Sequence, residues 1–242
     1  MLKRTASGFL AGGANLPDGD RSTPVIFLSA DGRRWSRFGV GQLRLAAGSG
    51  QVQDIRLAAA SGNRILIAGG VAAGAGRIGA AWLSDDGGRS WRPVTVPAGP
   101  GASAEFSDMA ATANGFLLVR AATVDGLPAA DVYRSGNGTD WTSAATLTTP
   151  AGFSPGLMNG GAAGAVLAGR SGPALTAFTS ADGVHWRQVP AFGRAPAEAV
   201  SGVAVTAGGA VIAAGGIRWS SCRRTGGSGP RPTASPSSLT AA

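Results

Sequence analysis

Few residues in this chain can act as nucleophiles, metal ligands or proton-transfer groups. Among 242 residues there is one histidine, His185, one cysteine, Cys222, and one tyrosine, Tyr133. A single cysteine forms no internal disulfide and no thiolate cluster, and a single histidine provides no His-rich metal site. The pair also gives little basis for Ser-His-Asp or Cys-His catalysis. We therefore expect no metal and no cofactor.

Carboxylates are the remaining candidates, because glycoside hydrolysis needs two of them roughly 5 to 10 Å apart on either side of a sugar. Three aspartates, Asp31, Asp86 and Asp182, stand in a recurring turn motif, and we interpret them as structural. Charged residues in the expected loops form instead a mixed rim, which suits a protein or carbohydrate ligand. The candidate rim residues are Asp54, Arg77, Glu105, Asp108, Arg194 and Glu198. No residue is assigned a catalytic role.

The turn motif occurs four times, with its acidic or Asn position at intervals of 55, 51 and 45 residues. An aromatic residue stands two positions before each Ser, at Phe27, Trp82, Tyr133 and Phe178. Ser and Asp side chains accept backbone hydrogen bonds in tight turns, and Gly supplies a positive φ, so the motif predicts a β-hairpin. The recurring residues are Ser29, Asp31, Gly32 and Trp35; Ser84, Asp86, Gly88 and Trp91; Ser135, Asn137, Gly138 and Trp141; and Ser180, Asp182, Gly183 and Trp186.

The elements that position these turns are short strands. The 40 Gly and 14 Pro disfavour long helices. The second unit shows four apolar segments, at 54–60, 64–68, 78–84 and 91–96, and four strands in each repeat of this length are typical of a β-propeller blade. We predict an all-β propeller of four-stranded antiparallel blades, about four and a half to five in number. The expected units are 1–40, beginning at its second strand, then 41–98, 99–148, 149–192 and a partial 193–221, followed by a disordered Gly/Pro/Ser/Thr-rich tail, 222–242.

The four turns resemble the Asp-box (BNR) repeat of sialidase-like propellers, whose pattern is Ser-x-Asp-x-Gly-x-x-Trp. The second turn has that spacing, and the other three are one residue shorter between Asp and Trp. The resemblance implies a truncated bacterial member with an extracytoplasmic, secreted location, although no signal peptide is recognisable. It also implies an Arg triad, a Tyr nucleophile with a Glu, and an Asp acid/base. Tyr133 occupies the aromatic position of its repeat, so this machinery is not assigned here.

The net charge of +8 comes from arginines scattered over the units, with Lys3 as the one lysine. Nucleic-acid binders concentrate such residues on one element, so we expect no nucleic-acid partner. No apolar run approaches the roughly 18 residues that span a bilayer.

These observations favour a non-catalytic binding or scaffolding module for a protein or glycan. The alternative is a truncated or degenerate glycoside hydrolase of the sialidase type, and a third reading is a broken ring without a function of its own. Three arrangements of the ring stay open: a closed five-bladed ring, an open arc that assembles with another chain, or a fragment of a larger ring. We favour the fragment, because an open arc exposes unpaired edges and invites self-association.

Overall fold

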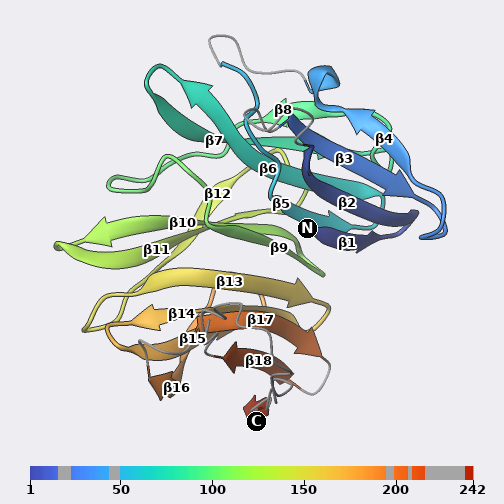
Figure 1. The fold of residues 1–242 in the computed structure, drawn as a ribbon. Helices are drawn as coiled ribbons and strands as arrows, with labels where there is room; N and C mark the ends of the chain where they lie inside the picture. The colour runs from blue at the N-terminus through green and yellow to red at the C-terminus, as the bar shows by residue number, and fades with distance from the viewer. Residues whose placement is uncertain (16–22, 44–49, 195–198, 207–208, 216–237, 242) are drawn as a thin grey trace, which may run out of the picture.

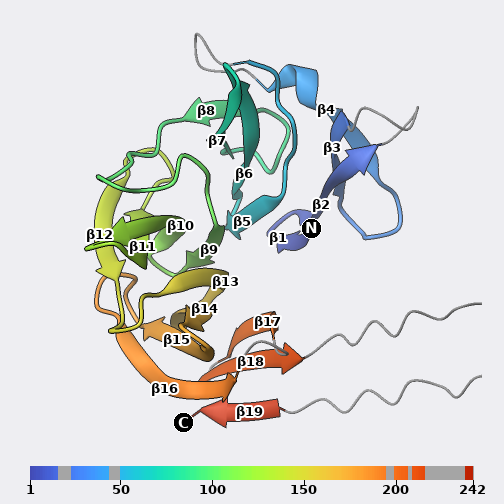
Figure 2. The ribbon, with the colours of Figure 1, turned by 60° about the vertical axis from the view of Figure 1, so that its left-hand side comes forward.

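The computed structural model describes residues 1–15, 23–43, 50–194, 199–206, 209–215 and 238–241. Its strands form five antiparallel sheets that follow one another along the chain (Figure 1). Figure 2 shows the sheets side by side along an arc, with the N-terminal sheet at one end and the C-terminal sheet at the other. The predicted all-β propeller is confirmed, with five blades.

Each of the first four blades has four strands in sequence order. Blade 1 contains β1 (Leu2–Thr5), β2 (Gly8–Asn15), β3 (Thr23–Ser29) and β4 (Ser36–Gly39), and a short 3-10 turn, Val40–Gln42, follows it. Blade 2 contains β5 (Leu57–Ser61), β6 (Arg64–Ala73), β7 (Gly76–Ser84) and β8 (Arg92–Val94). Blade 3 contains β9 (Asp108–Thr112), β10 (Gly115–Val124), β11 (Leu127–Ser135) and β12 (Thr142–Leu147). Blade 4 contains β13 (Ser154–Gly161), β14 (Gly164–Ser171), β15 (Ala174–Ser180) and β16 (Arg187–Arg194).

Blade 5 consists of β17 (Ala199–Thr206), β18 (Gly209–Gly215) and β19 (Ser238–Ala241). We expected residues 222–242 to be a disordered tail. The structure differs at β19, which is a strand within that range. Leu239 pairs with Ile212, and β19 follows the free edge of β18 over four residues. The apolar Leu239 and β-branched Thr240 suit a strand, and the unpaired N–H and C=O groups of β18 provide a partner for it. Residues 222–237 of the expected tail lie outside the described residues.

The first blade also differs from the sequence reading, which starts it at the second strand. The segment Leu2–Thr5 is a full first strand, and Leu2 pairs with Ala11 of β2. Its residues are mostly polar, so it lacks the apolar pattern by which the other first strands are recognised. The backbone pairing with β2 forms this strand without that pattern.

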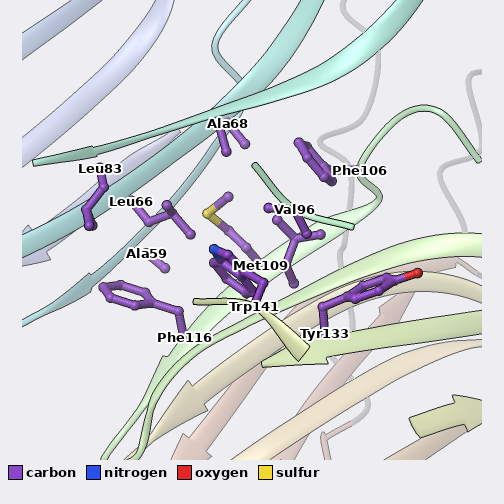
Figure 3. Close-up of a cluster of buried hydrophobic side chains, with 12 residues drawn as sticks. Ala59, Leu66, Ala68, Leu83, Val96, Phe106, Met109, Phe116, Tyr133 and Trp141 are labelled. Carbon is purple, nitrogen blue, oxygen red and sulfur yellow. The ribbon is translucent and has the colours of Figure 1, made fainter. Parts of the chain in front are cut away.

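The core lies between the blades. Each of the four hydrophobic clusters combines residues from two consecutive blades. The cluster between blades 2 and 3 has Met109 in its middle, among Leu66, Val96 and Trp141 (Figure 3). Trp82 is 0% exposed and Trp141 is 9% exposed, so each contributes a large buried aromatic side chain to its cluster.

The first strands of successive blades, β1, β5, β9, β13 and β17, contact one another in order. Their packing requires small residues. A side chain at Gly160 of β13 would place its Cβ 2.5 Å from the carbonyl oxygen of Ala111 in β9. The many Ala and Gly residues of these strands therefore allow the backbones of neighbouring blades to approach closely.

Candidate binding site on the loop face

The two ends of the strands form two different faces. We call the turn from the repeated Ser to the repeated Trp a corner, and the face that holds the corners the corner face. Strand β7 begins near Arg77 and ends at Ser84, the first residue of a corner. Arg77 and the β6–β7 hairpin therefore lie on the opposite face, which we call the loop face. The connections that enter β5 and β9 reach the same face, since these strands are antiparallel to their neighbours.

The corners are held by a repeated set of hydrogen bonds. In each one the Ser hydroxyl accepts the backbone N–H of the corner Gly at 2.7 to 2.8 Å. The Asp or Asn Oδ1 accepts backbone N–H groups of the residues just before the Trp. The Trp indole N–H donates to the carbonyl of the corner Gly at 3.0 to 3.2 Å. The residues involved are Ser29, Asp31, Gly32 and Trp35; Ser84, Asp86, Gly88 and Trp91; Ser135, Asn137, Gly138 and Trp141; and Ser180, Asp182, Gly183 and Trp186.

These hydrogen bonds change the acidity of the corner aspartates. Burial acts to raise the pKa of Asp86, but hydrogen bonds from the side chain and backbone of Ser90 and from Ser84 outweigh it and lower the pKa to about 2. The hydrogen bond from the His185 ring is the largest cause that lowers the pKa of Asp182. Backbone N–H groups, first that of Arg34, lower the pKa of Asp31. These carboxylates are ionised at neutral pH and engaged within their own turns.

The second corner accommodates its additional residue with two glycines. Gly87 and Gly88 both have positive φ, at 73° and 96°, whereas the other corners use one such glycine. Two consecutive residues in this region of φ/ψ space are tolerated mainly by glycine. The Gly-Gly pair therefore explains how the longer spacing keeps the same hydrogen-bond pattern.

The loop face gathers three of the six predicted rim residues at the junction of blades 2 and 3. Arg77 forms an ion pair with Asp54, and its Nε lies 3.3 Å from Oε2 of Glu105. Arg56 donates to the same oxygen at 2.5 Å. These four side chains, which we call the loop-face cluster, are 28 to 43% exposed. Carboxylates and guanidinium groups thus alternate along a half-exposed chain of ion pairs.

Two glycines make room for this cluster. A Cβ at Gly70 would lie 1.9 Å from Nε of Arg77, and a Cβ at Gly69 would lie 1.9 Å from the carbonyl oxygen of Asp54. The backbone N–H of Gly70 also donates to Oδ1 of Asp54 at 2.8 Å. The Arg77–Asp54 pair therefore packs directly against the backbone of β6 at these two glycines.

A buried arginine supports the loop that carries Glu105. Arg120 of β10 is 4% exposed, and its Nη1 donates to the carbonyls of Ser103 and Ala104 at 3.0 and 2.8 Å. The guanidinium lies 4.2 Å from the ring centre of Phe106, close enough for a cation–π contact. Burial lowers the pKa of this guanidinium, and the nearby Tyr133 acts in the opposite direction. Sequence reasoning missed Arg120, although one arginine within the apolar run of β10 was a signal for a buried polar contact.

The other predicted rim residues lie elsewhere. Asp108 was expected on the exposed rim, but its carboxylate accepts the backbone N–H groups of Met109 and of Met158 in β13, both at 2.7 Å. Burial raises the pKa of Asp108. This residue therefore links the first strands of blades 3 and 4, because the start of β9 faces the next blade. Arg194 is the last residue of β16, and its side chain is not described. Glu198 lies outside the described residues.

A pocket of about 310 Å³ lies on the corner face, between the third and fourth corners. Arg134, Asp140 and Asp182 are among its lining residues. Asp140 accepts a hydrogen bond from Asn137, and Asp182 is engaged by its own turn. The carboxylates of this pocket are therefore already hydrogen-bonded within the corners. For this reason the loop-face cluster is the better candidate site.

The described residues contain no group of three or more His, Cys, Asp and Glu side chains arranged to hold a metal ion. His185, the one histidine, pairs with Asp182 through Nδ1 at 2.6 Å, and its side chain is 88% exposed. In the same described part of the chain, no helix is long and apolar enough to cross a membrane.

No protein-family model and no curated protein sequence matches this chain. Solved structures match its fold. A Trypanosoma rangeli sialidase has 15% identity and a TM-score of 0.55, over 88% of this chain and 42% of the sialidase. The same sialidase with the inhibitor DANA has 15% identity and a TM-score of 0.51, over 85% and 42%. A GH74 xyloglucanase from Xanthomonas campestris has 19% identity and a TM-score of 0.48, over 87% and 34%.

This chain spans about two fifths or less of the length of these proteins. At such identities the likeness shows the fold alone: a sialidase-like β-propeller.

Proposed function

We propose that this chain is a non-catalytic β-propeller module that binds a carbohydrate through the loop-face cluster. The observation that carries the proposal is the alternation of Asp54, Arg77, Glu105 and Arg56 on one half-exposed surface. Alternating acceptors and donors suit the hydroxyl groups of a sugar, each of which both donates and accepts hydrogen bonds. The sialidase-like fold supports a glycan more than a protein ligand, the other partner that the sequence allows.

The positions of the two carboxylates favour binding over hydrolysis. A glycosidase needs two carboxyl groups with the scissile sugar bond between them. Here Arg77 pairs with both Asp54 and Glu105, so its guanidinium lies between the two carboxylates. Burial raises the pKa of Asp108, and both of its carboxylate oxygens accept hydrogen bonds from backbone N–H groups. In this arrangement neither Asp54 nor Glu105 is placed to act as a general acid or a nucleophile on a substrate.

The proposal includes the finer assignment of the four corners to the Asp-box repeat of bacterial, secreted propellers. Its support is the repeated Ser, Asp or Asn, Gly and Trp set, with the same hydrogen bonds in four blades. In this assignment the corners stabilise the blades and take no part in ligand binding.

Isothermal titration calorimetry with sialyllactose and with lactose tests the proposal. We expect the full chain to bind at least one of them and Arg77→Ala to reduce that affinity at least tenfold. Arg92→Ala is the matched control, because Arg92 pairs with Asp85 on the corner face at 2.9 Å. Absence of binding to both sugars would contradict the proposal. Release of a fluorophore from a 4-methylumbelliferyl glycoside, lost in Asp54→Asn, would establish instead the truncated glycoside hydrolase.

A further inference from the structure

The corner face gathers arginines that are scattered along the sequence. Some lie inside a corner, some stand directly beside a corner Ser or Trp, and the others lie in strands close to one. They are Arg4, Arg33, Arg34, Arg37, Arg64, Arg89, Arg92, Arg134 and Arg187, and all nine are exposed. The same face carries five aspartates, Asp31, Asp85, Asp86, Asp140 and Asp182. Nine arginines against five aspartates leave four positive charges in excess, whereas the remaining described residues are nearly balanced, with six basic against five acidic.

The hairpins between first and second strands bring two of these arginines to the corners. A Cβ at Gly8, in the β1–β2 hairpin, would lie 2.1 Å from the carbonyl oxygen of Ser29, the first residue of a corner. Arg4 lies in β1 beside this hairpin. Arg64 lies in the equivalent hairpin of blade 2, and its Nη1 donates to the carbonyl of Gly136 in the third corner at 3.3 Å. Both arginines therefore belong to the corner face.

The aspartates of this face neutralise few of its arginines. Asp31, Asp86 and Asp182 accept N–H groups of their own turns. Asp140 accepts a hydrogen bond from Asn137 at 2.8 Å. Only Asp85 pairs with arginines, with Arg64 at 3.7 Å and with Arg92 at 2.9 Å. Within the described part of the chain, the other seven arginines of this face form no ion pair, so their guanidinium groups are available to a partner.

These arginines spread over the face in two directions. Arg4 lies on the first strand of blade 1, Arg64 on the second strand of blade 2, Arg134 on the third strand of blade 3, and Arg187 on the fourth strand of blade 4. A linear polyanion would contact residues along one line, either around the arc or across a blade. A distribution over four blades and all four strand positions matches a partner that is itself an extended surface.

We propose that the corner face docks onto a bilayer that contains anionic phospholipids, with its arginines on the headgroup phosphates. A guanidinium group binds phosphate through two parallel hydrogen bonds, and clusters of several basic residues attract proteins to anionic bilayers. The Ser, Asp or Asn, Gly and Trp residues of the corners hold the turns in place and do not contact the lipid. The loop face then points away from the bilayer, so the loop-face cluster stays open to the solution.

Co-sedimentation of the full chain with vesicles tests this proposal. We expect binding to vesicles of phosphatidylcholine mixed with phosphatidylglycerol, no binding to phosphatidylcholine alone, and release as the NaCl concentration rises. Two double variants each remove two positive charges: Arg89→Ser with Arg134→Ser, and Arg34→Ser with Arg187→Ser. Each is expected to weaken binding roughly 25-fold, about fivefold for each arginine. Similar losses from both pairs are expected because they lie on different blades of one contact surface.

The matched control makes the same change in net charge on the other face. Val124→Glu with Leu127→Glu adds two negative charges to the β10–β11 hairpin of the loop face, where these side chains are 37 and 43% exposed. This variant is expected to bind the anionic vesicles like the parent. Arg89→Lys with Arg134→Lys keeps both charges and is expected to retain most of the binding. Circular dichroism of each variant confirms that it is folded.

Absence of binding to the anionic vesicles at low salt would overturn the proposal. Equal weakening by the loop-face control would also overturn it, because net charge and not the corner face would then decide the binding. Binding to dextran sulfate without binding to vesicles would assign the arginines to a linear polyanion instead. The vesicles carry no glycan, so this test is independent of the sugar-binding function proposed for the loop face.

Discussion

Carboxylate side chains have different roles on the corner face and on the loop face. On the corner face, Asp31, Asp86 and Asp182 bind backbone N–H groups within four residues of themselves. On the loop face, Asp54 and Glu105 bind arginines that lie 23 to 49 residues away in the chain. The first arrangement is a local turn motif that recurs with the repeat, and the second depends on how two blades meet. A repeat can therefore preserve the corners in four described blades while one junction differs from the rest.

The largest effect is expected for a corner residue that also fills a blade interface. Trp141→Ala removes a side chain that is 9% exposed and sits in the cluster between blades 2 and 3. We expect a loss of about 3 to 5 kcal/mol in the free energy of unfolding. Urea denaturation measures this loss. Trp35→Ala is the control, and because Trp35 is 39% exposed, it is expected to lower the free energy of unfolding much less. Equal losses would show that the corner turn, and not the interface, dominates.

Arg120→Ala is expected to have the next largest effect. It leaves the carbonyls of Ser103 and Ala104 without their buried donor, at a cost of about 1 to 3 kcal/mol. The loop that carries Glu105 should loosen, so the affinity for the sugar falls along with the stability. Hydrogen exchange of residues 96–105 and calorimetry report the two effects. A variant with normal binding would show that the loop keeps its position without Arg120.

The pH dependence of Asp86 separates charge from hydrogen bonding in the corners. Its folded pKa of about 2 lies below the ordinary 3.8, so its contribution to stability is present above pH 3.8 and is lost as the pH falls toward 2. Asp86→Asn keeps the Oδ1 acceptor, as Asn137 does in the third corner. We expect the variant to lose less stability than the parent between about pH 4 and 2. Identical acid unfolding curves for the two proteins would contradict this.

Arg77→Ala is expected to have the smallest effect on folding and a large one on binding. Half-exposed ion pairs contribute about 0 to 1 kcal/mol, so the unfolding midpoint should hardly move while affinity for the sugar is lost. Arg77→Lys keeps the charge but not the planar guanidinium, and it should restore only part of the affinity. A large drop in stability with Arg77→Ala would make the cluster a structural element instead.

The sequence predicted the architecture well, because a blade is encoded locally. The Ser-x-Asp and Trp positions mark each third and fourth strand, and the register of β7 with β8 and of β11 with β12 follows from the corner between them. The segments β1 and β19 were not predicted, since Leu2–Thr5 and Ser238–Ala241 form strands through backbone pairing and show no apolar pattern.

The candidate site was predicted only in part. Asp54, Arg77 and Glu105 were chosen as loop charges, but nothing in their spacing shows that blades 2 and 3 bring them together. Asp108 follows Glu105 by three residues and points to a different neighbour, the backbone of Met158. Long-range packing decides between these outcomes, and a sequence without its fold does not display it.

Gly70 makes the loop-face cluster sensitive to a single carbon atom. An alanine there would place its methyl group where Arg77 now lies, and the flexible guanidinium would have to leave before the strand moved. The space between Asp54 and Glu105 would then open to solvent. One methyl group would thus separate a neutralised, ion-paired surface from one with a net negative charge, in which Asp54 has lost its arginine and Glu105 keeps Arg56 alone. The electrostatic character of this junction is therefore set by the backbone of β6 as much as by its charges.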